Sequence, residues 1–245
     1  MKTQKRKTIE ISGIVIIAVI VISIIAVILL KYNVEGEMDM PYLLKKMVII
    51  STANGTNTPT DENRWNININ QNTDIYFDIE RNTEHKSTEN IKKIKIQNIQ
   101  ITGTEKYTPK AYMPSSETEK MFTYTDNNII QNELIYEVAK DKDTQNKKIT
   151  TEGRIIAISF CNPNIATYKG NEEKMNYDGT LLKKAGITLE QIKSTIKFDL
   201  VLETVSGKKY KTEINLHTPS EDITETGIVI TEDTELQNIV FKRTN

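Results

Sequence analysis

Few side chains in this sequence could carry out covalent chemistry, because the chain has one cysteine and two histidines. Cys161 follows the apolar run Ile-Ile-Ala-Ile-Ser-Phe, where a strand would end, and His85 lies upstream of it. A cysteine attacks as its thiolate, so catalysis would require a nearby cation that lowers the pKa of the thiol. His85 sits in a polar turn and His217 at a strand end, where both are expected to be solvated loop residues.

This combination resembles the sortase transpeptidases, which join an amino-terminal anchor to a β-barrel with one Cys, one His and one Arg. The resemblance implies an envelope-modifying enzyme with Cys161 as nucleophile and His85 as its partner. The sequence departs from the family pattern, because Ile-Ser-Phe-Cys-Asn-Pro stands where sortases have Thr-Leu-x-Thr-Cys, and no arginine follows until Arg243. A sortase-like cysteine transpeptidase, or another envelope-modifying enzyme, therefore stays the alternative, and we expect Cys161 to be buried and unreactive.

Two acidic segments could attract cations. Asp141, Asp143 and Gln145-Asn146, with Glu152 at the twelfth place, resemble the spacing of oxygen ligands in an EF-hand, but interleaved lysines and a strand-like sequence downstream favour a charged hairpin loop. The run 221–235 is acidic without any Lys or Arg, and such runs are usually solvated or mobile. We predict no catalytic, cofactor-binding or metal-binding residues, and no cofactor.

The most distinctive segment of the sequence runs from Ile11 to Leu30 and carries no charge over twenty residues. A helix of this length, at about 1.5 Å per residue, matches the hydrocarbon core of a bilayer. The segment is longer than the apolar region of a cleavable signal, and it lacks an Ala-x-Ala site at its end. We therefore predict a retained, single-pass transmembrane helix bounded by Ile11 and Leu30, with cleavage as the alternative.

The charges that flank this segment predict its orientation. Four basic residues precede it, whereas a single Lys31 stands directly after it and acidic residues follow. The positive-inside rule then places residues 1–10 in the cytoplasm as a basic tail. Residues 31–41 would form a linker and residues 42–245 an extracellular domain, so the first expected partner is the lipid bilayer.

Apolar residues alternate with polar ones through most of the outer segment, which predicts half-buried strands. Strands are expected at 65–69 and 75–79, with 71–74 either turning between them or bending one strand. Alternation also runs from Ile94 to Ile101, with a change of phase at Gln97-Asn98 that a β-bulge would explain.

The second half of the chain continues this pattern. Strands are expected at 154–161, 198–205, 208–217 and 236–242, and Ser206-Gly207 has the composition of a tight hairpin turn. Short helices are expected at 180–185 and at 188–191, where Thr188 and Gln191 have the spacing of a capping box. The predicted fold is an all-β, immunoglobulin-like β-sandwich with one or two short helices, as one domain or divided near 104–120.

Two stretches, WNININQNTDIYFDIERN and DGTLLKKAGITLEQIKSTIKFDLVLETVSGKKYKTEINLHTP, resemble segments of uncharacterised, single-pass surface proteins of low-GC Gram-positive bacteria. The resemblance covers about a third of the chain. It implies a location and a β-sandwich ectodomain, but it implies no activity and no functional residues.

Charge narrows the class of partner. The chain has a net charge of −1, and the part beyond residue 31 is more negative, which argues against nucleic acid as a partner. We expect a non-enzymatic binding or structural role at the cell envelope, with an unknown envelope protein or glycan as partner. The loops 52–63, 103–120 and 162–179 are expected on the sandwich surface. The second and third of these carry the tyrosines most suited to recognition, Tyr107, Tyr112, Tyr168 and Tyr177.

Overall fold

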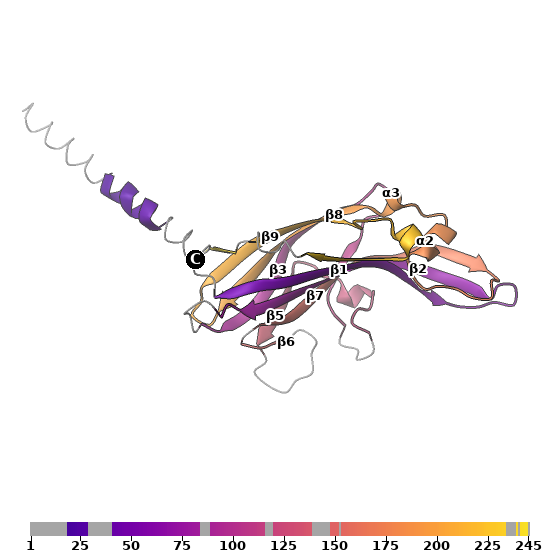
Figure 1. The fold of residues 1–245 in the computed structure, drawn as a ribbon, viewed down its shortest axis with the longest axis horizontal. Helices are drawn as coiled ribbons and strands as arrows, with labels where there is room; N and C mark the ends of the chain where they lie inside the picture. Colours follow the sequence, from indigo (N-terminus) through magenta and orange to yellow (C-terminus); the bar gives the residue numbers. More distant parts are fainter. Residues whose placement is uncertain are drawn as a thin grey trace, which may run out of the picture.

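The computed structural model describes residues 19–28, 41–83, 89–115, 120–138, 148–151, 153–233, 239 and 241–244, which form two facing β-sheets. Sheet A has the order β10-β1-β2-β7-β4 and sheet B the order β11-β9-β8-β3-β5-β6. All neighbouring strands are antiparallel except the short parallel pair of β5 and β6. Figure 1 shows the two layers, and the prediction of an all-β sandwich is confirmed.

The strands of sheet A are β1 (Tyr42–Asn57), β2 (Trp65–Arg81), β4 (Lys110–Tyr112), β7 (Gly153–Gly170) and β10 (Ile228–Asp233). Those of sheet B are β3 (Ile91–Thr102), β5 (Glu133–Val138), β6 (Lys148–Ile149), β8 (Ser194–Thr204), β9 (Lys209–Thr218) and β11 (Lys242–Arg243). The short helices are η1 (Asp126–Asn128), α2 (Thr180–Lys184), α3 (Leu189–Ile192) and α4 (Ile223–Thr226). Strands on both sides of 104–120 pair within each sheet, as β2 does with β7 and β3 with β8.

Strand β2 shows how the sequence builds the interior. Its odd-numbered residues face inward, because successive side chains of a strand point to opposite faces of the sheet. Ile75, Phe77 and Ile79 enter the main core between the two sheets, where Phe77 meets Phe198 of β8 edge-on. Further along the strand, Ile67 and Ile69 enter a second core.

Helices, and not sheet B, cover this second core. It lies where β1, β2 and β7 continue past sheet B toward α2 and α3 in Figure 1. Its buried members are Ala53, Ile67, Ile69, Ile165, Leu181, Leu182, Ile187, Ile192, Ile223 and Val229. The long strands therefore extend one sheet over two separate apolar clusters.

A belt of buried polar side chains separates the two cores on the inner face of sheet A. Ser51 and Thr73 are joined by a 3.0 Å hydrogen bond between their hydroxyls, and the Asn162 amide donates to Gln71 Oε1 at 2.7 Å. These four residues are at least 95% buried, so each bond satisfies groups that water does not reach.

Several local predictions are confirmed. Ser206-Gly207 joins β8 to β9, and Gly207 has the positive φ of 88° that the tight turn requires. The phase change in β3 is a bulge at Asn98, whose φ is 56°. Thr188 and Gln191 form the expected capping box at the start of α3.

Of the two alternatives for 71–74, the single strand is correct, because β2 is one 17-residue strand whose pairing with β7 shifts between Ile69 and Gln71. Other local predictions are wrong. The predicted loops lose residues 52–57 to β1 and 162–170 to β7. The acidic run 221–235 contains the ordered elements α4 and β10. The last strand expected at 236–242 stays a prediction, because only residues 239 and 241–242 of it lie within the described residues.

The predicted transmembrane segment lies only partly within the structure. Residues 19–28 are helical with exposed side chains, whereas 11–18, 29–30 and the tail and linker at 1–10 and 31–40 lie outside the described residues. Within the described ranges, no helix has the length and apolar character needed to cross a bilayer.

Candidate functional site

The outer face of sheet A points away from sheet B. A chain segment that carries Tyr124 covers one half of this face, and the other half is uncovered. One row of paired residues crosses all five strands, from Ile230 and Ile50 through Asp74 and Ser159 to Tyr112. The first two side chains of this row are partly or largely exposed, whereas Ser159 and Tyr112 are buried. The change from exposed to buried side chains occurs at Asp74, in the middle strand of the sheet.

The covered half is a polar cluster formed by Asp74, Ser159, Tyr112, Tyr124 and Cys161. The segment between β4 and η1 brings Tyr124 over the sheet, where its ring meets Tyr112 edge-on with 5.3 Å between centroids. Ser159 Oγ donates to Asp74 Oδ1 at 2.5 Å, and the Tyr124 hydroxyl lies 3.4 Å from Ser159 Oγ. Cys161 is fully buried, as the sequence predicted.

Burial disfavours the charged forms of the ionisable side chains in this cluster. It raises the pKa of the Cys161 thiol, and the Asp74 carboxylate raises that pKa further. Burial also raises the pKa of Tyr112 to about 12 and is the main cause of the raised pKa of Asp74. An activated cysteine needs the opposite environment, a cation that lowers the thiol pKa, so the surroundings of Cys161 do not support the sortase-like mechanism.

We expect Asp74→Asn to raise stability at neutral pH. Because the pKa of Asp74 is raised in the folded state, the native protein binds more protons than the unfolded chain between the ordinary Asp pKa and the raised one. Stability should therefore fall as pH rises through this interval, and Asp74→Asn should remove that decrease while Ser159 can still donate to the amide oxygen. Urea unfolding between pH 4 and 8 measures both effects, with Asp61→Asn as the exposed control. A wild-type stability that rises through this interval relative to Asp74→Asn would contradict the assignment.

Other predicted site residues are not gathered here. His85, Asp141, Asp143, Gln145, Asn146 and Glu152 lie outside the described residues, so the EF-hand-like spacing stays a sequence observation. His217 is exposed near the end of β9, with Nδ1 3.0 Å from Thr195 Oγ1. Within the described ranges, no three His, Cys, Asp or Glu side chains are grouped in a way that could hold a metal.

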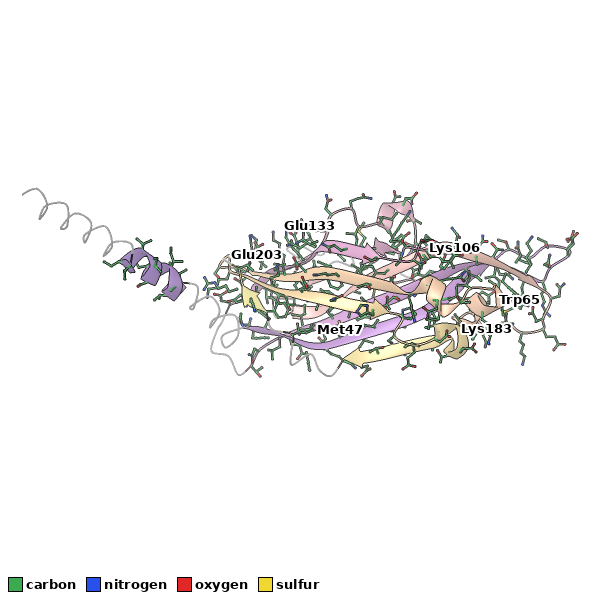
Figure 2. All side chains as sticks on the ribbon, turned by 90° about the horizontal axis from the view of Figure 1, so that it is seen from above. Met47, Trp65, Lys106, Glu133, Lys183 and Glu203 are labelled. Atoms are coloured by element: carbon green, nitrogen blue, oxygen red, sulfur yellow. The ribbon has the colours of Figure 1, made fainter. Side chains whose placement is uncertain are left out.

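The tyrosines of the two expected recognition loops have different environments. Tyr112 is buried in the polar cluster, and Tyr107 packs against the second core. Tyr168 donates to the Glu172 carboxylate, and Tyr177, which is 45% exposed, meets Trp65 edge-on at 6.2 Å. Figure 2 shows Trp65 near the opposite end of the molecule from Glu203.

The uncovered half of the outer face of sheet A is apolar. We call it the bare face, and its members are Val48, Ile50, Tyr76, Ile155, Ile228 and Ile230. Ile155, Ile228 and Ile230 are 58%, 47% and 56% exposed, although β-branched side chains of this size are usually buried. Apolar residues gathered on neighbouring strands are typical of an interaction surface.

The bare face ends at β10, the outermost strand of sheet A. Strand β10 pairs only with β1 among the strands that the structure describes, so its other side presents backbone groups that could pair with another strand. Glu232 forms a 2.9 Å ion pair with Lys46 at the margin of this face, and Glu221 lies exposed near the start of α4. The edge therefore combines an apolar surface with acidic neighbours.

The fold and this surface define a β-sandwich protein with an exposed edge strand. Comparison of the chain with protein-family models, with curated proteins and with solved structures finds no match. Sequence reasoning missed the bare face because it interpreted 221–235 as a solvated acidic run. The alternation in Ile228-Val229-Ile230 was the available signal, since Val229 enters the second core between two outward isoleucines.

Proposed function

We propose that this chain is a single-pass membrane protein whose β-sandwich lies outside the cell and binds an envelope protein without catalysing a reaction. The bare face with its outermost strand β10 carries this proposal. The amino terminus would lie in the cytoplasm, as the basic residues before Ile11 predict.

The apolar composition of residues 11–30 supports the membrane anchor. Residues 11–30 hold three isoleucines, valines or leucines for every other residue, and these outweigh the cost of two serines and a glycine in a bilayer. The domain begins with β1, whose first residue is Tyr42 and whose 16 residues span about 50 Å. Trp65 would then project away from the membrane, and the bare face would lie along the side of the domain.

The strand order supports an immunoglobulin-like layout. In that fold, strands A, B, E and D form one sheet and strands C, F and G the other. The neighbours β1-β2-β7-β4 and β3-β8-β9 follow this arrangement, with β5 added beside β3. Strands β10 and β11 extend the two sheets beyond it, and β10 is the strand that bounds the bare face.

The chemistry of the edge indicates what would bind there. An extended segment that pairs with β10 would alternate its side chains, so that every second one contacts Ile228 and Ile230. Glu221 is exposed and forms no ion pair with another described residue, so it favours a basic residue in that segment and disfavours a second copy, which would bring like charges together. The proposed partner is therefore an envelope protein with an extended, Lys- or Arg-containing apolar strand.

Photo-crosslinking in intact cells that make the full chain tests this function. With p-benzoylphenylalanine in place of Ile230, we expect one discrete adduct larger than the 28.0 kDa chain, and protease added outside the cells should degrade it. The same group in place of Val205, which is 67% exposed in the β8–β9 turn, is the control and should give no such adduct. An adduct with a second copy, equal adducts at both positions, none at all, or resistance to the protease would each contradict the proposal.

A further inference from the structure

A groove of about 590 Å³ opens beside the bulge of β3, on a different part of the molecule from the bare face. The pairing of β3 with β5 ends at Gln97 and Glu133, and the next residue of β3 is Asn98 in its left-handed conformation. The segment before β5 turns away toward β4, where Ile130 N donates to Ala111 O at 2.9 Å. The groove lies between these diverging segments, and Glu133, labelled in Figure 2, is part of its lining.

The carboxylates around this groove are neutralised by basic partners. Glu133 forms a 2.8 Å ion pair with Lys95. Asp199, in an adjoining depression that shares Asn98, accepts from the Asn98 amide at 2.7 Å and lies 3.3 Å from Lys211 Nζ. A charged ligand would have no opposite unpaired charge to meet, so the groove is suited to an uncharged one.

The groove offers amides beside an apolar surface. The side chains of Gln97, Gln131 and Asn132 make no hydrogen bond with another described residue, and each amide can both donate and accept. Met113, Ile129 and Ile130, all partly buried, supply the apolar part of the lining. Sugar hydroxyls also donate and accept, and the C–H faces of a sugar ring are apolar.

A peptide strand fits this groove less well than a sugar does. Strand addition requires a continuous extended edge, whereas the φ of 56° at Asn98 interrupts β3 where its pairing with β5 stops. The volume is also within the range of small-molecule sites, about 300–1,000 Å³. We propose that the groove beside Asn98 binds an uncharged oligosaccharide through the amides of Gln97, Gln131 and Asn132.

Titration of the full chain with defined oligosaccharides tests the proposal. The chain should be held in lipid nanodiscs, because detergents with sugar headgroups would compete for the groove. The probes are chitotriose, cellotriose and maltotriose as uncharged sugars, trigalacturonate as an anionic sugar, and an uncharged tripeptide. We expect at least one uncharged trisaccharide to bind at millimolar concentration or below, with an affinity that does not change with salt.

The double variant Gln131→Ala/Asn132→Ala should weaken this binding about tenfold or more, which corresponds to ~1.4 kcal/mol. Both side chains are exposed and without hydrogen-bond partners among the described residues, so the unfolding midpoint should not change. Asn127→Ala, an exposed amide on η1 outside the groove, is the matched control and should bind as the wild type does. Binding of none of the uncharged sugars, preference for the anionic sugar or the peptide, or equal affinity in the double variant would overturn the proposal. None of these results depends on whether Ile230 crosslinks a partner.

Discussion

Replacing Phe198 by alanine should reduce the free energy of unfolding by about 3–5 kcal/mol. Phe198 lies on β8 and is 1% exposed in the centre of the main core. Its ring meets Phe77 of β2 edge-on at 5.9 Å between centroids, and it stacks with Phe160 of β7 at 6.2 Å. One side chain of sheet B thus contacts two strands of sheet A, and its loss would leave a cavity that neither sheet can fill without moving.

Urea unfolding, followed both by circular dichroism and by fluorescence, measures this loss. Trp65 is the only tryptophan and packs against the second core, so its fluorescence reports on a cluster that Phe198 does not join. If the two cores unfold together, both signals should shift to the same lower urea concentration. Val205→Ala, at an exposed turn position, should change stability by less than about 0.5 kcal/mol. A Trp65 transition that stays at its wild-type midpoint would show instead that the cores unfold separately.

Replacing Tyr136 by phenylalanine should cost about 2–4 kcal/mol, because one hydroxyl satisfies two backbone groups of β7. The pairing of β4 with β7 covers only residues 159–161, so the backbone of Ala157 has no β4 neighbour. Tyr136, on β5 of the other sheet, donates its hydroxyl to Ala157 O at 2.5 Å and accepts from Ala157 N at 3.0 Å. Ala157 is 4% exposed, so water cannot replace either bond without local opening.

Amide hydrogen exchange distinguishes this effect from a general loss of packing. In Tyr136→Phe, the Ala157 amide should exchange faster than expected from the change in global stability alone. Tyr177→Phe is the matched control, because Tyr177 is exposed and its hydroxyl makes no hydrogen bond with a described residue. Its effect on stability should stay below about 0.5 kcal/mol. Unchanged stability in Tyr136→Phe would contradict the prediction that this hydroxyl replaces the hydrogen bonds of a neighbouring strand.

Local chemistry made several elements predictable. The Ser206-Gly207 turn needs a positive φ that glycine adopts readily, and the Gln97-Asn98 phase change needs an extra residue in one strand. Residues 52–57 have the composition of a loop, because Asn54-Gly55-Thr56 is typical of a turn, yet they belong to β1. In the structure, Asn54 exchanges side-chain hydrogen bonds with Asn72 and Asn70 of β2, so its neighbours across the sheet stabilise a strand that the local sequence disfavours.

The β-rich class of fold follows from the amino-acid sequence alone, because a period of two between apolar residues is a local property of each strand. The burial of Cys161 was predictable in the same way, although β7 continues past it to Gly170. Which side chains meet depends instead on the fold of the whole domain, as the row from Ile230 to Tyr112 shows. Pairing between distant strands sets such a row, and no local pattern specifies whether a segment such as the one carrying Tyr124 will cover it. That is why the same outer face holds buried Ser159 and Tyr112 in one half and exposed isoleucines in the other.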